Sequence, residues 1–142
     1  MEMMKRKSVD LLVEQFWKNG YLTIRRKFGT YLPEPAKVGD FDVDIIARYK
    51  ESYAIGLTLT RNDMNNPKIK EKLIFLATRQ TRFTNKPVKL FIGADETIFK
   101  NAKALVETLE NDVRKNIRIF QIMDRPVELK RKHDFKEKVL FS

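Results

Sequence analysis

Residues 40–60 read DFDVDIIARYKESYAIGLTLT, and this stretch limits the folds open to the chain more than any other. Apolar and polar side chains alternate on both sides of a short polar segment, which predicts two strands joined by a tight turn. Asp40, Asp42 and Asp44 then share one face of the first strand. The opposite face, expected in the core, carries Phe41, Val43 and Ile45. Three carboxylates this close repel one another unless water, a cation or a basic group lies among them.

The rest of the chain supplies elements that could cover such a hairpin. Residues 8–19 predict a helix that begins at Ser8 and ends at Asn19-Gly20. Its buried stripe, at helical spacing, carries Val9, Leu12, Val13, Phe16 and Trp17. The other expected elements are a strand over residues 21–28, a helix over 67–82, a strand over 88–93, a helix over 98–113 and a strand over 117–122.

This order predicts an α/β fold with a mixed β-sheet flanked by helices. The hairpin makes the early strands antiparallel, and a strand, a helix and a strand in succession imply a right-handed parallel crossover. We expect one domain over residues 1–124, followed by a basic tail over residues 125–142. The only histidine, His133, lies in that tail, which argues against a Ser-His-Asp triad or a histidine-rich metal site in the core.

The charge of the chain points to its partners. There are 29 Lys and Arg residues against 19 Asp and Glu, a formal net charge of +10, which is typical of proteins that bind DNA or RNA. The chain has no cysteine, which removes disulfides and zinc-thiolate sites. No apolar run is long enough to span a bilayer and no signal-peptide pattern precedes the first helix, so we expect a cytoplasmic protein without a membrane partner.

The basic residues gather in two stretches. One precedes a long loop, residues 29–39, and the other follows the hairpin over residues 61–89, where eight Lys or Arg accompany two acids. The candidate phosphate contacts are Arg25, Arg26, Lys27, Arg61, Lys68, Lys70, Lys72, Arg79 and Arg82. Tyr31 in the loop could stack on a base, but we favour its packing against the loop itself.

The element order, with an acid entering the hairpin, resembles the restriction-endonuclease-like PD-(D/E)xK nuclease superfamily, and within it the Holliday-junction-resolvase branch. The resemblance covers roughly residues 8–122 and implies a restriction-endonuclease-like core of order αβββαβαβ. In that family an Asp and an Asp/Glu-x-Lys on neighbouring strands hold Mg²⁺ and position the attacking water. The resemblance implies Asp44 as the strand acid and Asp10 or Glu14 as a first-helix acid; members often dimerise, so it also implies a homodimer.

The Asp/Glu-x-Lys position departs from that family. It falls on Gly56-Leu57-Thr58, so the second metal-binding acid and the lysine are both missing. One preorganised charge of this kind stabilises a transition state by about 3 to 4 kcal/mol, and losing two leaves little activity without replacement groups. We therefore expect impaired catalysis.

Three interpretations follow, and whether the chain is an enzyme stays open. In the first, which we favour, catalysis is lost and the fold binds nucleic acid or a protein partner. In the second, the missing groups have migrated: Asp42 joins Asp44 at a Mg²⁺ ion, and Lys68, Glu71 or Lys72 reaches over from the helix, with Lys72 and Asp44 as the catalytic pair of a metal-dependent endonuclease. In the third, the acidic hairpin is a surface feature paired with the basic run of residues 25–27, and the chain serves in protein interaction or assembly.

Overall fold

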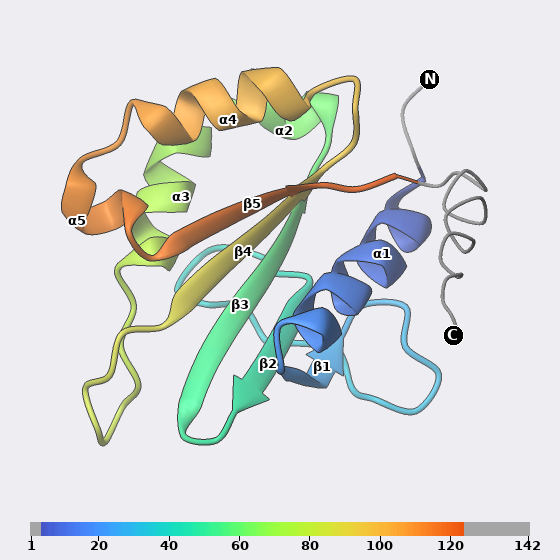
Figure 1. The fold of residues 1–142 in the computed structure, drawn as a ribbon, viewed down its shortest axis with the longest axis vertical. Coiled ribbons are helices and arrows are strands. Elements are labelled where there is room, and N and C mark those ends of the chain that lie inside the picture. The colour runs from blue at the N-terminus through green and yellow to red at the C-terminus, as the bar shows by residue number, and fades with distance from the viewer. Residues whose placement is uncertain (1–3, 124–142) are drawn as a thin grey trace, which may run out of the picture.

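A computed structural model describes residues 4–123, a five-stranded mixed sheet packed against helices (Figure 1). In chain order the elements are α1 (Lys5–Lys18), β1 (Leu22–Arg26), β2 (Ile45–Tyr49), β3 (Ser52–Leu59), α2 (Arg61–Asn65), α3 (Ile69–Ala77), β4 (Lys89–Ala94), α4 (Phe99–Glu107), α5 (Asn111–Arg114) and β5 (Ile117–Gln121). The α/β class and the mixed sheet predicted from the sequence are confirmed. The basic tail with His133 lies outside the described residues.

The strands follow one another across the sheet in the order of the sequence, β1-β2-β3-β4-β5. β1, β2 and β3 are antiparallel neighbours, whereas β3, β4 and β5 run parallel. A parallel pair needs a connection that crosses over the sheet, and α2 with α3 and α4 with α5 provide the two crossovers. The hairpin therefore joins an antiparallel half of the sheet to a parallel half.

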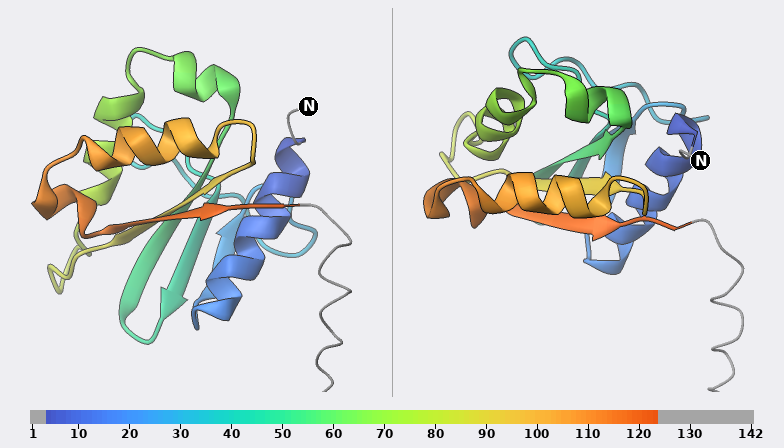
Figure 2. Two further views of the ribbon diagram at one scale, coloured as in Figure 1. Left: turned by 45° about the horizontal axis from the view of Figure 1, so that its top comes forward. Right: turned by 90° about the horizontal axis from the view of Figure 1, so that it is seen from above.

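Each face of the sheet has its own core, and the helices divide between them (Figures 1 and 2). On one face α1 is the helix that the described residues provide, with the Phe16 ring stacked on Phe91 at 4.4 Å between centroids. On the other face α3 and α4 cover the apolar residues of β3 and β4. β3 shows the predicted alternation: Ile55, Leu57 and Leu59 face α3 and α4, while Ala54 faces α1.

The segment before β2 is not the regular acidic strand that the sequence predicts. β2 begins at Ile45, so Asp40 and Asp42 lie in the preceding loop and the three carboxylates do not share a strand face. Val43 and Ile45 pack on opposite faces of the sheet instead of the same one. The alternation fails because residues 38–41 form a turn at Gly39, closed by the bridge between Val38 and Phe41.

Three helical predictions also need correction. α1 begins at Lys5, so Ser8 is a buried residue within the helix and not its cap, and Trp17 is 71% exposed and not part of the core. α3 ends at Ala77, short of the predicted end, and residues 98–113 form two helices, α4 and α5. Within residues 4–123 there is no helix long and apolar enough to span a membrane.

Candidate functional site

The Asp44 carboxylate is buried at the point where β2 begins, with only 2% of the residue exposed. Its Oδ2 atom accepts hydrogen bonds from the Thr58 backbone N–H at 2.7 Å and from the Thr58 hydroxyl at 2.9 Å. The Lys5 ammonium donates a third hydrogen bond to the same oxygen at 3.0 Å. Buried carboxylates are costly unless they are paired and hydrogen-bonded, and Asp44 meets both conditions.

Two lysines from distant parts of the chain balance the charge of Asp44. Lys5, in the first turn of α1, also donates to the Thr58 carbonyl oxygen at 2.8 Å, so its ammonium lies between an oxygen of Asp44 and an oxygen of β3. Lys27, just after β1, places its Nζ 3.8 Å from the other carboxylate oxygen. The backbone holds this geometry, since the Lys27 N–H donates to the Asp44 carbonyl and the Asp44 N–H to that of Gly56.

Lys72 of α3 is a third lysine in the same neighbourhood. Burial lowers the pKa of its ammonium below the ordinary value of 10.5, and the negative charges of Asp63 and Asp44 partly oppose that effect. The positive charge of Lys5 adds to the lowering of the Lys72 pKa, and the negative charge of Asp42 opposes it. Within the described residues no hydrogen bond or ion pair joins Lys72 to Asp44, so its approach to Asp44 from the helix stays a prediction.

The other predicted acids lie elsewhere. Asp10 forms an ion pair with Arg26. Glu14 lines a small cavity beside Lys18 and Gln121, and Glu71 is exposed on α3 beside Ile74.

These positions test whether Mg²⁺ fits the site. No set of three Asp, Glu, His or Cys side chains suited to hold a metal occurs in the part of the chain that the structure describes. One oxygen of Asp44 already accepts three hydrogen bonds and the other faces Lys27. Mg²⁺ requires several oxygen ligands in near-octahedral geometry. The residues present do not fit the ion, and the Lys5 ammonium is itself the cation at Asp44.

Gly56, the position that the resemblance gave to the second acid, lies in the core. A Cβ atom at Gly56 would lie 2.7 Å from both Ile45 Cβ and Phe16 Cε2, inside the core beneath α1. The side chain that meets Asp44 is Thr58, two residues further along β3. Gly56 and Thr58 share one face of β3 because they lie two residues apart, and of the two only Thr58 contacts Asp44.

A second cavity, of about 450 Å³, lies beside the Lys5 and Lys27 segments, and Arg6, Asp10, Arg26 and residues 28–32 line it. The Arg6 guanidinium lies 5.8 Å from the centre of the Phe28 ring, and Phe28 has a φ of 61°, a strained conformation for a bulky residue. Tyr31 is 94% exposed, so the predicted packing of Tyr31 against its loop is wrong. We call Lys5, Arg6, Lys27, Phe28 and Tyr31 the basic-aromatic surface.

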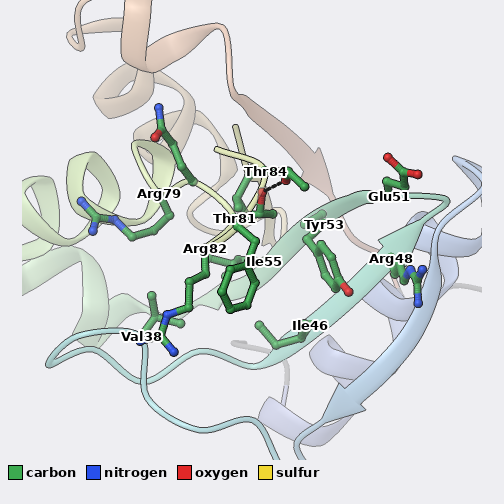
Figure 3. Close-up of a pocket in the computed structure, with 14 residues that line it drawn as sticks. Val38, Ile46, Arg48, Glu51, Tyr53, Ile55, Arg79, Thr81, Arg82 and Thr84 are labelled. Atoms are coloured by element: carbon green, nitrogen blue, oxygen red, sulfur yellow. Dashed lines mark hydrogen bonds between the residues drawn. The ribbon is translucent and has the colours of Figure 1, made fainter. Parts of the chain in front are cut away.

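The remaining basic residues separate into two groups. Arg25, Lys68 and Lys70 are exposed, and Arg61 belongs to α2, directly after the end of β3 that meets Asp44. Arg79 and Arg82 line a cavity beside the opposite end of β3, together with Tyr53 (Figure 3). The structure therefore does not gather the predicted phosphate contacts on one surface.

Comparisons of the chain with protein-family models, with curated proteins and with solved structures find no match. What the site can do is therefore inferred from the contacts and charges of its own residues.

Proposed function

We propose that the chain is a nucleic-acid-binding protein with a restriction-endonuclease-like fold whose cleavage site is degenerate. The element order and the antiparallel-to-parallel sheet support the fold, and Asp44 corresponds to the acid that enters the hairpin in that family. The observation that carries the proposal is the Lys5–Asp44–Thr58 arrangement. The Lys5 ammonium of α1 neutralises the buried Asp44 carboxylate, and residues 4–123 bring together no set of side chains suited to hold a catalytic metal.

The basic-aromatic surface supports binding to nucleic acid and not merely to anions. Cationic side chains attract phosphates whatever the sequence, and an exposed aromatic ring gives an unpaired base a face to stack on. Tyr31 projects such a ring into solvent, and Arg6 lies against the neighbouring Phe28. Because stacking needs an exposed base, the surface favours single strands, ends or branched structures over continuous duplex.

Fluorescence anisotropy with a labelled single strand, a duplex and a four-way junction tests this proposal. Each neutralised phosphate releases counterion, so we expect the affinity to fall steeply between 50 and 200 mM salt. A flat salt dependence, or no binding to any of the three substrates, would count against nucleic-acid binding.

The Tyr31→Ala variant tests the surface itself. Tyr31 is almost fully exposed, so its loss leaves the fold intact, and one lost stacking contact weakens single-strand binding about tenfold. Trp17→Ala is the matched control, because Trp17 is an exposed aromatic residue near the other end of α1 from Lys5. Equal losses in the two variants would remove the basic-aromatic surface from the proposal.

Cleavage is the second candidate function, and the position of Lys72 is the observation in its favour. Incubation of the wild type and of Asp44→Ala with DNA and RNA substrates, with Mg²⁺ or Mn²⁺ added, decides between binding and cleavage. We expect no cleavage by either protein. Cleavage by the wild type alone would establish a nuclease, whereas cleavage by both would come from a contaminant or another site.

A further inference from the structure

The cavity at the opposite end of β2 and β3 from Asp44 is not used by the proposed function. It has a volume of about 570 Å³, within the range of small-molecule sites. Its floor is apolar, with Ile46 and Ile55 from the sheet, Val38 from the loop before β2 and Val88 from the segment before β4. The rings of Tyr53 and Phe83 also line it, and Phe83 is 90% exposed.

The loop that forms one wall is held by its own hydrogen bonds. The Thr81 N–H donates to the Lys86 carbonyl at 2.9 Å, and the Lys86 N–H donates to the Thr81 hydroxyl at 3.1 Å. The Val88 N–H closes the loop on the Arg79 carbonyl at 3.0 Å, and Thr81 and Thr84 contact each other through their hydroxyls (Figure 3). These hydrogen bonds fix the conformation of the loop over residues 79–88, so the cavity wall has a defined shape.

The charged side chains of the cavity are mostly positive. Arg48, Arg79 and Arg82 line it, and the one acid, Glu51, forms an ion pair with Lys86 at 3.1 Å. Arg79 is engaged elsewhere, since its guanidinium lies 3.8 Å from the centre of the Phe75 ring and donates to the Phe75 carbonyl. Within residues 4–123 Arg82 forms no ion pair, and Arg48 keeps its terminal nitrogens available, so these two guanidinium groups face a ligand.

Arg48 and Arg82 approach the cavity from different sides. Figure 3 shows Arg82 extending toward Val38, with Tyr53 and Arg48 across the cavity from it. Arg48 lies over the Tyr53 ring at 5.8 Å and donates through Nε to the Lys50 carbonyl, which leaves its terminal nitrogens for another acceptor. Guanidinium groups above an apolar, aromatic floor match an anion that has a flat apolar body.

We propose that this cavity binds a small organic anion, an aromatic ring system that carries a carboxylate, phosphate or sulfonate group. The ring system enters between the loop wall and the floor formed by Ile46 and Ile55. The acidic group meets Arg82, and Arg48 adds positive charge from the other side of the cavity. The site is separate from the basic-aromatic surface and does not depend on nucleic-acid binding.

A pair of probes that differ by one acidic group tests the proposal. Anilinonaphthalene sulfonate has an aromatic body and a sulfonate, and phenylnaphthylamine has the same body without the charge. Amide chemical-shift titrations on the isotope-labelled protein report both affinity and location. We expect saturable binding of the sulfonate with shifts around Ile46, Tyr53 and Thr81, and about tenfold weaker binding of the neutral probe.

The Arg82→Gln variant removes the guanidinium that the acidic group meets, and we expect the tenfold preference for the sulfonate probe to shrink to about two- to threefold, the rest coming from the charge of Arg48. Lys103→Gln removes the same charge from the exposed face of α4 and keeps the tenfold difference. The amide spectrum of each variant shows that it is folded. Equal affinity of the two probes for the wild type, shifts confined to other parts of the protein, or no binding of the sulfonate would overturn the proposal.

Two further pairs extend the test to metabolite-like acids: adenosine monophosphate against adenosine, and indole acetate against indole. Tighter binding of the charged member at the cavity residues in either pair supports the site and identifies the acidic group it accepts. Hexaglutamate is the last arm, because it carries acid without an aromatic body. If hexaglutamate binds the cavity as tightly as the sulfonate probe, the site is a docking surface for acidic peptides and the proposal fails.

Discussion

Asp44 remains inside the protein because Lys5, Lys27 and Thr58 supply the contacts that water would supply outside. A buried pair of this kind adds little to stability compared with well-packed apolar residues. Removing only one partner of the pair lowers stability strongly, because the remaining charge then lies buried with fewer partners. The two lysines consequently add little net stability, but losing either of them would destabilise the fold.

Replacing Lys5 with methionine tests that asymmetry. We expect Lys5→Met to lower the free energy of unfolding by about 2 kcal/mol, measured by urea denaturation, because Asp44 loses its closest cation. Adding Asp44→Asn should recover part of the loss, since no carboxylate then needs a partner. If Lys5→Met is as stable as the wild type, the Lys27 ammonium alone is sufficient for Asp44.

Lys72 gives a prediction about pH. Because burial holds its pKa in the folded protein below 10.5, the unfolded chain binds more protons between the lowered value and 10.5. The stability of the wild type therefore gains from Lys72 as pH rises through that interval. We expect the wild type to gain stability relative to Lys72→Met as the pH rises from the lowered pKa to about 10.5, and the difference to be constant below that interval. A parallel pH series on Lys103→Met should show a constant difference.

The residues of the site differ in how far the sequence could indicate them. Asp44 stood out as an acid next to a strand, and Lys72 as one base of a basic helix. Lys5 was missed, because it precedes the apolar stripe of α1 and meets Asp44 from 39 positions away. Nothing in the local pattern marks such a pairing, since the fold alone brings the two segments together.

At the scale of elements, β3 is the strand on which both cores and the Asp44 site depend. Its residues alternate between the faces, and Thr58 at its end meets Asp44. Gly56 allows Phe16 of α1 and Ile45 of β2 to approach the strand closely. Packing therefore requires glycine at this position, where the nuclease family has a metal-binding acid.

A methyl group at Gly56 tests the close approach. We expect Gly56→Ala to lower the free energy of unfolding by about 1 to 3 kcal/mol, because the new Cβ overlaps Ile45 and Phe16 within a packed core. Gly93→Ala on β4 is the control, since a Cβ there meets its nearest atoms at an ordinary 3.4 Å. Thermal unfolding of both variants measures the contrast, and equal stabilities would show that the core beneath α1 is loosely packed.

The elements themselves were predictable where periodicity extends over several turns or residues, as in α1, β3 and β4. Short elements were not. α2 is a single helical turn that follows Thr60, whose side chain and that of Asp63 cap each other's backbone N–H groups. The spacing of Thr60 and Asp63 is the sequence signal for the start of a helix, although Asn62, Asn65 and Asn66 are typical of turns. The prediction of a strand over the acidic segment before β2 was wrong because the chain turns at Gly39.

At the scale of the molecule, the sequence predicted a mixed sheet because the hairpin and the later crossovers impose different strand directions. It did not predict how the basic residues divide between the two ends of β3, since that division depends on where each loop returns to the sheet. The net charge of +10 is a property of the whole chain, and positive charges repel one another in the folded state more than in the expanded one.

Salt should consequently stabilise the fold while it weakens nucleic-acid binding. We expect the Tm to rise by a few degrees between 10 and 200 mM NaCl, because screening at a Debye length near 10 Å or less reduces the repulsion among like charges. Scanning calorimetry at constant pH measures the change. A falling Tm would mean that attractive ion pairs such as Lys5–Asp44 outweigh the repulsion.

The sequential strand order also has a consequence for synthesis. Each strand pairs with the strand made just before it, so the sheet can grow one strand at a time as the chain leaves the ribosome. α1 is made first, yet its Phe16 stacks on Phe91 of β4, which is translated 75 residues later. Until β4 leaves the ribosome, part of the apolar face of α1 stays exposed to solvent. We expect chaperones to bind the nascent chain mainly in this interval.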